Sequence, residues 1–233
     1  MTTPGLAAVL WDMDGTLVDT EPYWMAAEGA LVESFGGTWT HEQALGLVGA
    51  GLEDGARVLQ AAGVRMPEEH IVQWLTDQVM TQLESERRTG GRDPFRPGAR
   101  ELLRSLKDAG IPTGLVTMSR RRMAHIIVER IGFDAFDVVF AGDDVTRPKP
   151  YPDPYLLACE ALGVLAADAV AIEDSPNGLR SAVASGAVSL GVPLALSLEG
   201  VGAHELWPTL EGRTAEDLRA LHARHARKER TRA

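Results

Sequence analysis

The hydrophobic positions of this chain fall into short apolar runs and longer stretches with helical spacing. The short runs, which predict strands, cover residues 7–10, 113–116, 138–140, 169–172 and 188–192. Apolar stripes at helical spacing lie between consecutive runs, and glycines at their ends give stop signals, at Gly110, Gly132, Gly163 and Gly186. Strands that alternate with helices indicate an α/β fold, with a mostly parallel sheet and helices on both faces.

The alternation is interrupted between the first two apolar runs. Residues 19–94 carry helical signals but no clear strand, and a single crossover between strands needs far fewer residues. This segment therefore predicts an inserted all-helical domain, with residues 1–18 and 95–233 forming a discontinuous catalytic core. Two chain crossings would join the parts, and the second, residues 89–98, is rich in glycine and proline. Two flexible connections favour a lid that opens and closes, and a rigid appendage is the alternative.

Composition and charge narrow the class of partner. The chain has 233 residues with 23 basic and 33 acidic side chains, a formal net charge of −10. This balance disfavours nucleic acid or an anionic membrane as partner, and the basic run at residues 222–233 is expected to be a solvated terminus.

The N-terminal residues do not predict a signal peptide, and no apolar run reaches the length of about 18 residues typical of a membrane span. The single cysteine, Cys159, suits a reducing compartment, so we expect a cytoplasmic protein. For the oligomeric state, a monomer is the default expectation.

Two carboxylates, Asp12 and Asp14, come directly after the first apolar run. Residues two apart in an extended chain point the same way, so both side chains are aimed at one spot beyond the strand. Gly15 can adopt the sharp turn by which the chain leaves. Two carboxylates at one spot repel each other unless a cation is bound there, and Mg²⁺ prefers a few carboxylates plus substrate phosphate. The sequence therefore predicts a magnesium site at the end of the first strand.

Three further polar segments follow other predicted strands. Thr117 and Met118 lie where a strand turns into a helix, and a helix start offers N–H groups to a phosphate. Lys149 lies between two prolines that stiffen its loop, and Glu173 and Asp174 end the fourth apolar run. Because active sites of parallel sheets lie at the carboxyl ends of the strands, we expect all these segments to share one site.

Taken together, these segments resemble the four motifs of the haloacid dehalogenase-like hydrolases, in the branch with a helical cap that includes β-phosphoglucomutase and related sugar-phosphate phosphatases. The matching segments are WDMDGTLVDTEP, LVTMS, RPKPYPDPY and IEDSPNGLRSAVASG. Pro148 departs from the family, since relatives often carry glycine there. The resemblance spans nearly the whole chain. It implies a Rossmann-like core sheet of five parallel strands, with Asp12 on the central strand, and Mg²⁺-dependent phosphoryl transfer.

The resemblance also implies a role for each matching residue. Asp12 would attack phosphorus and become an aspartyl phosphate, while Asp14 would protonate the leaving alcohol and then help deprotonate the hydrolytic water. Mg²⁺ would be bound by the side chains of Asp12 and Asp174 and by the backbone carbonyl of Asp14, with Glu173 either a ligand or a partner through water. The groups expected to hold the transferring oxygens are Thr117, the Met118 N–H and Lys149.

Several activities exist on this fold, and particular residues separate them. Dehalogenation is disfavoured because it needs no acid such as Asp14. Trp24 and Leu52 stand where phosphomutase relatives carry a histidine and an arginine. We therefore predict a Mg²⁺-dependent phosphatase acting on a small phosphorylated metabolite, with a sugar phosphate as the favoured class. A sugar phosphomutase is the first alternative and a catalytically idle binding protein the second.

Two residues outside the core motifs are candidates for substrate contact. Trp24, in the predicted cap, is either a packing residue or a wall of the substrate site. Arg120 follows the second motif and either helps to hold a substrate phosphate or is a solvated residue of the first helical turn.

Overall fold

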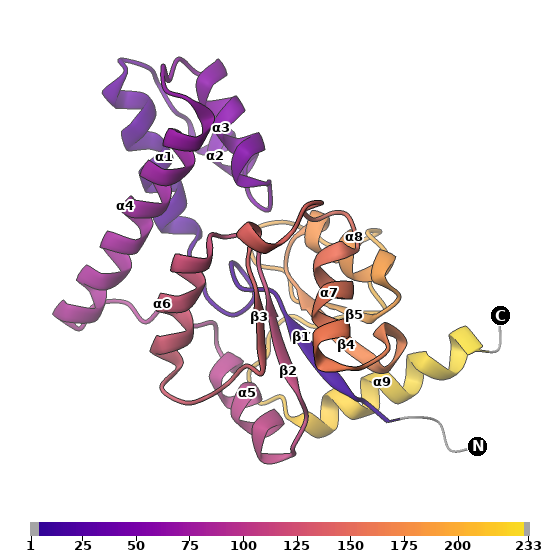
Figure 1. Cartoon of the computed structure of the whole chain (residues 1–233). Helices are drawn as coiled ribbons and strands as arrows, with labels where there is room; N and C mark the ends of the chain where they lie inside the picture. The colour runs from indigo at the N-terminus through magenta and orange to yellow at the C-terminus, as the bar shows by residue number, and fades with distance from the viewer. Residues whose placement is uncertain (1–4, 231–233) are drawn as a thin grey trace. The chain divides into compact units, whose positions relative to one another are not determined.

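The computed structural model describes residues 5–230, with side chains to residue 225. The described chain divides into two compact units. One unit contains the chain up to Leu17 and from Phe95 onward and carries the sheet, whereas the other, Val18–Pro94, contains helices (Figure 1). The assignment of these units as a catalytic core and a cap stays a prediction.

Within residues 5–230, the sheet has six parallel strands in the order β3-β2-β1-β4-β5-β6. The prediction of an α/β fold is confirmed, but the prediction of five strands is wrong. The sixth strand, at the edge, has only two residues, which is too short to give a periodic pattern. The strands are β1 (Ala8–Trp11), β2 (Thr113–Val116), β3 (Val138–Phe140), β4 (Ala169–Glu173), β5 (Val188–Gly191) and β6 (Glu205–Leu206).

Helices cover both faces of this sheet, which explains why its strands read as continuous apolar runs. Every residue of β1, β2, β4 and β5 is buried. Helices α7 and α8 lie on one face, and α5, α6 and α9 lie on the other (Figure 1). The helices of this unit are α5 (Ala99–Asp108), α6 (Arg121–Ile131), α7 (Asp153–Leu162), α8 (Pro176–Ser185) and α9 (Ala215–Arg230), with 3₁₀ turns η1 (Gly142–Asp144) and η2 (Ala166–Asp168).

The helical unit buries an apolar stripe of its longest helix. Its helices are α1 (Glu21–Ser34), α2 (His41–Leu45), α3 (Leu52–Ala61) and α4 (Glu68–Thr89). The buried residues of α4 include Ile71, Leu75, Val79 and Leu83. At the base of the unit, the Asp19 N–H donates to the Pro94 carbonyl at 2.7 Å, and Arg92 forms an ion pair with Asp19. The two ends of the insert are therefore tied together.

A buried carboxyl group in this unit makes its stability depend on pH. Glu28 of α1 is only 7% exposed, and its Oε2 has no hydrogen-bond partner within the described chain. Burial, with a smaller contribution from Glu21, raises the pKa of Glu28 from 4.5 to about 8. The folded state thus binds this proton more tightly than the unfolded state. The stability from Glu28 is complete below pH 4.5 and is lost as the pH rises towards 8.

Replacing Glu28 by glutamine is therefore expected to stabilise the protein at alkaline pH. At about 1.4 kcal/mol per pKa unit, the wild-type penalty at pH 8 and above is on the order of 5 kcal/mol. Calorimetric unfolding midpoints should coincide for the two proteins near pH 5 and separate above pH 8, with Glu28→Gln the more stable. Parallel pH profiles would show that Glu28 is not buried as a neutral group.

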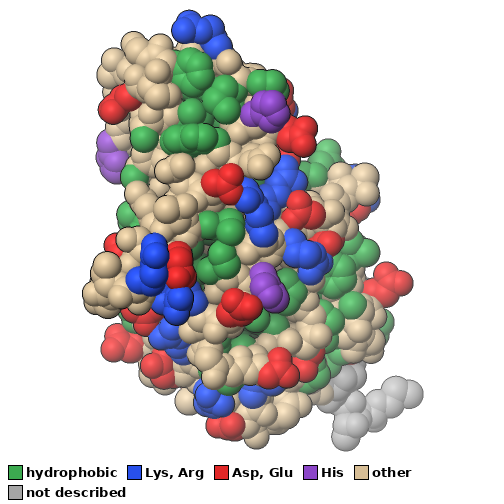
Figure 2. Space-filling model, turned by 60° about the vertical axis from the view of Figure 1, so that its left-hand side comes forward, with side chains coloured by type: hydrophobic (Ala, Val, Ile, Leu, Met, Phe, Trp, Pro, Cys, Tyr) green, Lys and Arg blue, Asp and Glu red, His purple; other side chains and the backbone are tan. Residues whose placement is uncertain are grey.

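Charged side chains of both signs share the face of the molecule drawn in Figure 2. On the face drawn in Figure 2, Lys and Arg side chains are interspersed with Asp and Glu rather than gathered into a broad field of one sign. Across residues 5–230, no helix combines the length and apolarity needed to cross a membrane. In the basic run, Arg224 and His225 contact Glu205, and the side chains beyond them lie outside the described residues. A cytoplasmic location stays a prediction.

Candidate active site

The register of the sheet brings the predicted segments to one edge. Trp11, the last residue of β1, pairs with Leu115 of β2 and with Ile172 of β4. Asp12 is therefore placed between the ends of β2 and β4, and its N–H donates to the Ile172 carbonyl at 3.1 Å. Glu173 ends β4 and is fully buried. This position on the third of six strands is where chain connections run to opposite sides, the usual location of a site in such folds.

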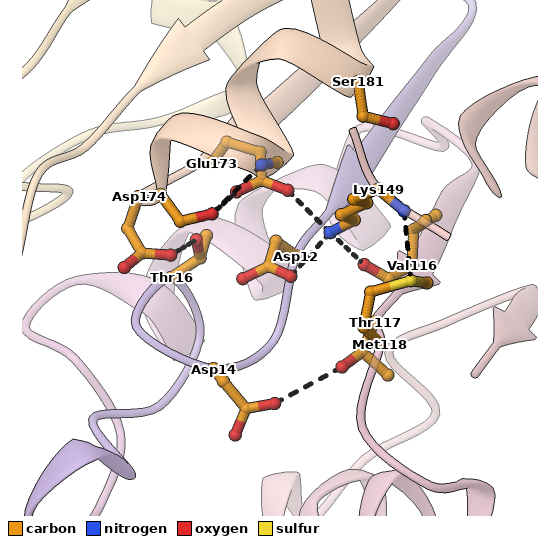
Figure 3. A network of polar contacts seen from close by, with 12 residues as sticks. Asp12, Asp14, Thr16, Val116, Thr117, Met118, Lys149, Glu173, Asp174 and Ser181 are labelled. Atoms are coloured by element: carbon orange, nitrogen blue, oxygen red, sulfur yellow. Dashed lines mark hydrogen bonds and ion pairs between the residues drawn. The ribbon is translucent and has the colours of Figure 1, made fainter. Parts of the chain in front are cut away.

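Lys149 is the centre of a buried polar network (Figure 3). Its ammonium donates to Asp12 Oδ1 at 2.7 Å, to Glu173 Oε1 at 2.6 Å and to the Val116 carbonyl at 2.9 Å. An ammonium group has three donors, so these partners within the described chain account for all of them. The Lys149 N–H also donates to the Met118 sulfur at 3.4 Å, which joins the loop of the third motif to that of the second.

Burial and charge set the protonation of this network. Burial, followed by repulsion from Glu173, raises the pKa of Asp12 to about 7, although Lys149 opposes the shift. Burial would lower the pKa of Lys149, but Asp12 and Glu173 outweigh it and hold this pKa above its ordinary value. Lys149 therefore stays charged. A cation beside Asp12 would favour the ionised carboxylate, which is the nucleophilic form.

The carboxylates of this site suit a divalent cation. Among residues 5–225, one group of acidic side chains could share an ion, namely Asp12, Glu173 and Asp174, whose candidate ligand atoms lie within 4.8 Å of one another. All three are buried, and Lys149 is the ammonium group bonded to two of them. Oxygen ligands with excess negative charge match the preference of Mg²⁺. The residues present thus fit the predicted metal.

The turn after β1 fits tightly against Asp174. Gly15 has φ of +86°, and a Cβ added there would lie 2.0 Å from Asp174 Oδ2. The next residue, Thr16, donates from its hydroxyl to Asp174 Oδ1 at 3.1 Å. The glycine is therefore required both by the left-handed backbone and by the close carboxylate.

Asp14 has a different environment from Asp12. Its Oδ2 accepts hydrogen bonds from the Ser119 hydroxyl at 2.6 Å and the Thr117 hydroxyl at 3.3 Å. Figure 3 shows the Asp14 carboxylate directed towards Thr117, away from the carboxylates around Lys149. Asp14 still contributes, by charge repulsion, to the raised pKa of Asp12, and the expectation that both side chains serve one site stays a prediction. Strand β1 ends at Trp11, so the alternation of an extended chain stops before Asp14.

The remaining candidates lie near the second motif or in the helical unit. Thr117 and Met118 precede α6 by several residues rather than forming its first turn, since that helix begins at Arg121. Arg120 forms a half-exposed ion pair with Asp143 at 3.2 Å. Trp24 is buried on α1 of the helical unit, so its contact with substrate stays a prediction.

Sequence analysis missed three hydroxyl groups that contact the candidate residues. They belong to Thr16, Ser119 and Tyr155, and the last donates to Glu173 Oε1 at 2.6 Å. Thr16 and Ser119 stand inside the quoted motifs, so proximity to a motif could have identified them. Tyr155 also stands inside a quoted motif, as the last residue of RPKPYPDPY, but it reads there as an ordinary core aromatic.

Comparisons with known proteins agree on the family. A family model described as haloacid dehalogenase-like hydrolase matches residues 6–186. The chain is 31% identical over 186 residues to the Phosphorylated carbohydrates phosphatase of Thermotoga maritima, a match covering 78% of this chain and 82% of that protein. It is 34% identical over 178 residues to the N-acetylmuramic acid 6-phosphate phosphatase of Pseudomonas aeruginosa, covering 76% of each.

Solved structures agree as well. The crystal structure of CbbY from Rhodobacter sphaeroides in complex with phosphate superposes with a TM-score of 0.78 at 30% sequence identity, covering 89% of this chain and 96% of that one. The sheet, the motif residues at its carboxyl edge and these matches lead to one conclusion: the chain belongs to the haloacid dehalogenase-like hydrolase family.

Proposed function

We propose that this hydrolase is a Mg²⁺-dependent phosphatase that cleaves a small phosphorylated carbohydrate through an aspartyl phosphate on Asp12. The observation that carries the proposal is the Lys149 ammonium bonded to one oxygen of Asp12, beside a buried acidic group suited to a cation. Two relatives that are named as phosphatases of phosphorylated sugars favour the same substrate class.

The chain must bring an anionic nucleophile to an anionic phosphate. At ~4 Å, two unit charges repel by roughly 4 kcal/mol at an effective dielectric constant of 20, so the approach of Asp12 needs compensating positive charge. Lys149 supplies one such charge from a loop stiffened by Pro148 and Pro150. Held in place before substrate arrives, it stabilises developing charge without reorganisation during the reaction.

Asp14 is suited to move protons on the other side of the phosphorus. Ser119 and Thr117 orient its carboxyl group by donating to Oδ2. In the first step, Asp12 attacks phosphorus while Asp14 gives its proton to the leaving alcohol. In the second, Asp14 takes a proton from the water that hydrolyses the aspartyl phosphate, which releases inorganic phosphate and regenerates Asp12.

The metal would complete the neutralisation. Its protein ligands would be the carboxylates of Asp12 and Asp174 and the backbone carbonyl of Asp14, with Glu173 a ligand or a partner through water. When bound, Mg²⁺ supplies positive charge to both the nucleophile and the phosphate oxygens. The nucleophile, the group that moves protons and the fixed ammonium group are all side chains of the protein itself.

Removal of divalent cations is expected to abolish hydrolysis reversibly. Mg²⁺ should also raise the unfolding temperature, because it relieves repulsion among the buried carboxylates, and at 100 times its Kd the stabilisation is about 2.7 kcal/mol. Thermal unfolding with EDTA and with Mg²⁺ measures this effect. Asp174→Asn should lose it, whereas replacing the exposed Asp134 should not. A Mg²⁺-independent midpoint would contradict the assigned metal site.

The function itself is tested with a panel of phosphorylated carbohydrates, including sugar 1-phosphates and 6-phosphates, with p-nitrophenyl phosphate as a generic ester. We expect Mg²⁺-dependent release of inorganic phosphate from at least one sugar phosphate. A coupled assay for conversion of β-glucose 1-phosphate separates the phosphomutase alternative, which would isomerise the sugar phosphate without net phosphate release. Absence of turnover on every ester would contradict the proposal.

A further inference from the structure

Tyr155 touches the candidate site without a place in the mechanism above. It lies in the first turn of α7 and is fully buried. Its hydroxyl donates to Glu173 Oε1 at 2.6 Å, and its ring centroid lies 5.0 Å from the Lys149 ammonium nitrogen. One side chain thus contacts both the candidate metal group and the cation that binds Asp12.

Glu173 is held from two directions. Within the described chain, its Oε1 accepts from Tyr155 and from Lys149, each at 2.6 Å, whereas Oε2 has only the Ser175 hydroxyl at 3.4 Å. The backbone of α8 also comes close, since a Cβ on Gly178 would lie 2.0 Å from Oε1 and 2.1 Å from Oε2. The carboxylate therefore has one well-defined orientation, fixed by short hydrogen bonds to Oε1.

The hydroxyl group of Tyr155 is not needed for packing. The ring belongs to an apolar cluster with Leu10, Ala158, Cys159 and other buried residues between the sheet and α7. A phenylalanine would fill this space equally well. A buried hydroxyl costs free energy unless it is hydrogen-bonded, and here its partner is Glu173. The hydroxyl oxygen of Tyr155 is thus explained by its hydrogen bond to the site, and not by packing in the core.

We propose that Tyr155 is a positioning residue that acts through Glu173. The proposal rests on the proposed function, because it assigns the hydroxyl to the preorganisation of that same site. By fixing Oε1, Tyr155 orients the Glu173 carboxylate towards Lys149, and Lys149 is thereby held on Asp12. The acidic group is then ordered before the cation arrives, so the free energy of Mg²⁺ binding is not reduced by the cost of that ordering.

Tyr155→Phe, with Tyr151→Phe as a matched control, tests the proposal. Tyr151 lies four residues earlier in the same segment and is 52% exposed. Partners that orient metal ligands typically contribute 10–100-fold to metal affinity or activity. In Tyr155→Phe we expect the Kd for Mg²⁺, measured by calorimetry without substrate, to rise about tenfold, and kcat to fall about tenfold or more with KM within about twofold. Tyr151→Phe should match the wild type in both.

A double-mutant cycle shows whether the hydroxyl acts through Glu173. In a Glu173→Gln background, the further change Tyr155→Phe should alter the Kd for Mg²⁺ by less than about twofold, since residues in one network are not additive. The proposal is overturned if Tyr155→Phe leaves the Kd and kcat of the wild type unchanged, with or without a lower unfolding temperature. It is also overturned if the effect is equally large with Gln at position 173.

The calorimetric measurement separates this inference from the proposed function. If the wild type hydrolyses no ester of the panel, the phosphatase proposal fails, and the Kd for Mg²⁺ in the two tyrosine variants still decides the role of Tyr155. If the wild type is an active phosphatase and Tyr155→Phe equals it in both readouts, only the inference fails.

Discussion

Asp12→Asn is expected to abolish phosphate-ester hydrolysis, with kcat lowered by at least about 10⁴-fold, because an amide cannot serve as the nucleophile. The fold should persist, since asparagine has nearly the same shape and relieves the repulsion between Asp12 and Glu173 that helps to raise the pKa of Asp12. Steady-state phosphate release with saturating Mg²⁺ measures the loss, and calorimetry verifies the folded state.

A matched control makes this result specific. Asp134→Asn changes an exposed aspartate in the segment before β3 and should leave kcat unchanged. Since asparagine can deamidate back to aspartate, the mass of the Asp12→Asn protein must be verified before and after the assay. Mg²⁺-dependent turnover in protein that has not deamidated would show that another group attacks phosphorus.

Removal of the Lys149 charge should affect both catalysis and stability. In Lys149→Met, the nearly buried carboxylates of Asp12 and Glu173 lose their ammonium partner, and breaking a buried pair from one side typically costs about 3–5 kcal/mol. We expect kcat to fall by about 10³-fold, because Asp12 and the phosphate lose a fixed counter-charge.

The pH dependence of the loss in Lys149→Met identifies its origin. Without the ammonium, the pKa of Asp12 rises further, so the variant is destabilised most where the carboxylates are ionised and least where they are protonated. The free energy of unfolding should therefore differ more from that of the wild type at pH 8 than at pH 5. Lys107→Met, which removes an exposed ion pair with Asp137, should cost less than about 1 kcal/mol at either pH. Equal losses at pH 5 and pH 8 in Lys149→Met would point to lost packing instead of unpaired charge.

Much of the fold followed from the order of apolar runs. The predicted bounds of β2 and β3 agree with the structure, and α6, α7 and α8 each end at the predicted glycine. Strands buried on both faces give uninterrupted apolar runs, and glycine readily adopts the left-handed conformation at a helix end. Because all strands are parallel, the polar residues that follow them lie at one edge of the sheet. Asp12, Lys149 and Glu173 could therefore be assigned to one site from the sequence, and the structure brings them into contact.

Other features depend on contacts that no local pattern encodes. Strand β6 is too short for periodicity. The direction of Asp14 is set by two hydroxyl groups more than 100 residues away in sequence. Tyr155 is apolar in its ring and polar only at its tip, so its sequence position is equally consistent with core packing or with a bond to Glu173. Tertiary structure alone decides between such alternatives.

The central claim, covalent catalysis by Asp12, is tested most directly by rapid acid quench of the enzyme during turnover of a good substrate, followed by peptide mass spectrometry. The account predicts one added phosphoryl group on the peptide that contains Asp12, formed at a rate no slower than kcat and absent from Asp12→Asn. Phosphorylation of a different residue, or steady turnover with no phosphorylated enzyme at any quench time, would contradict it.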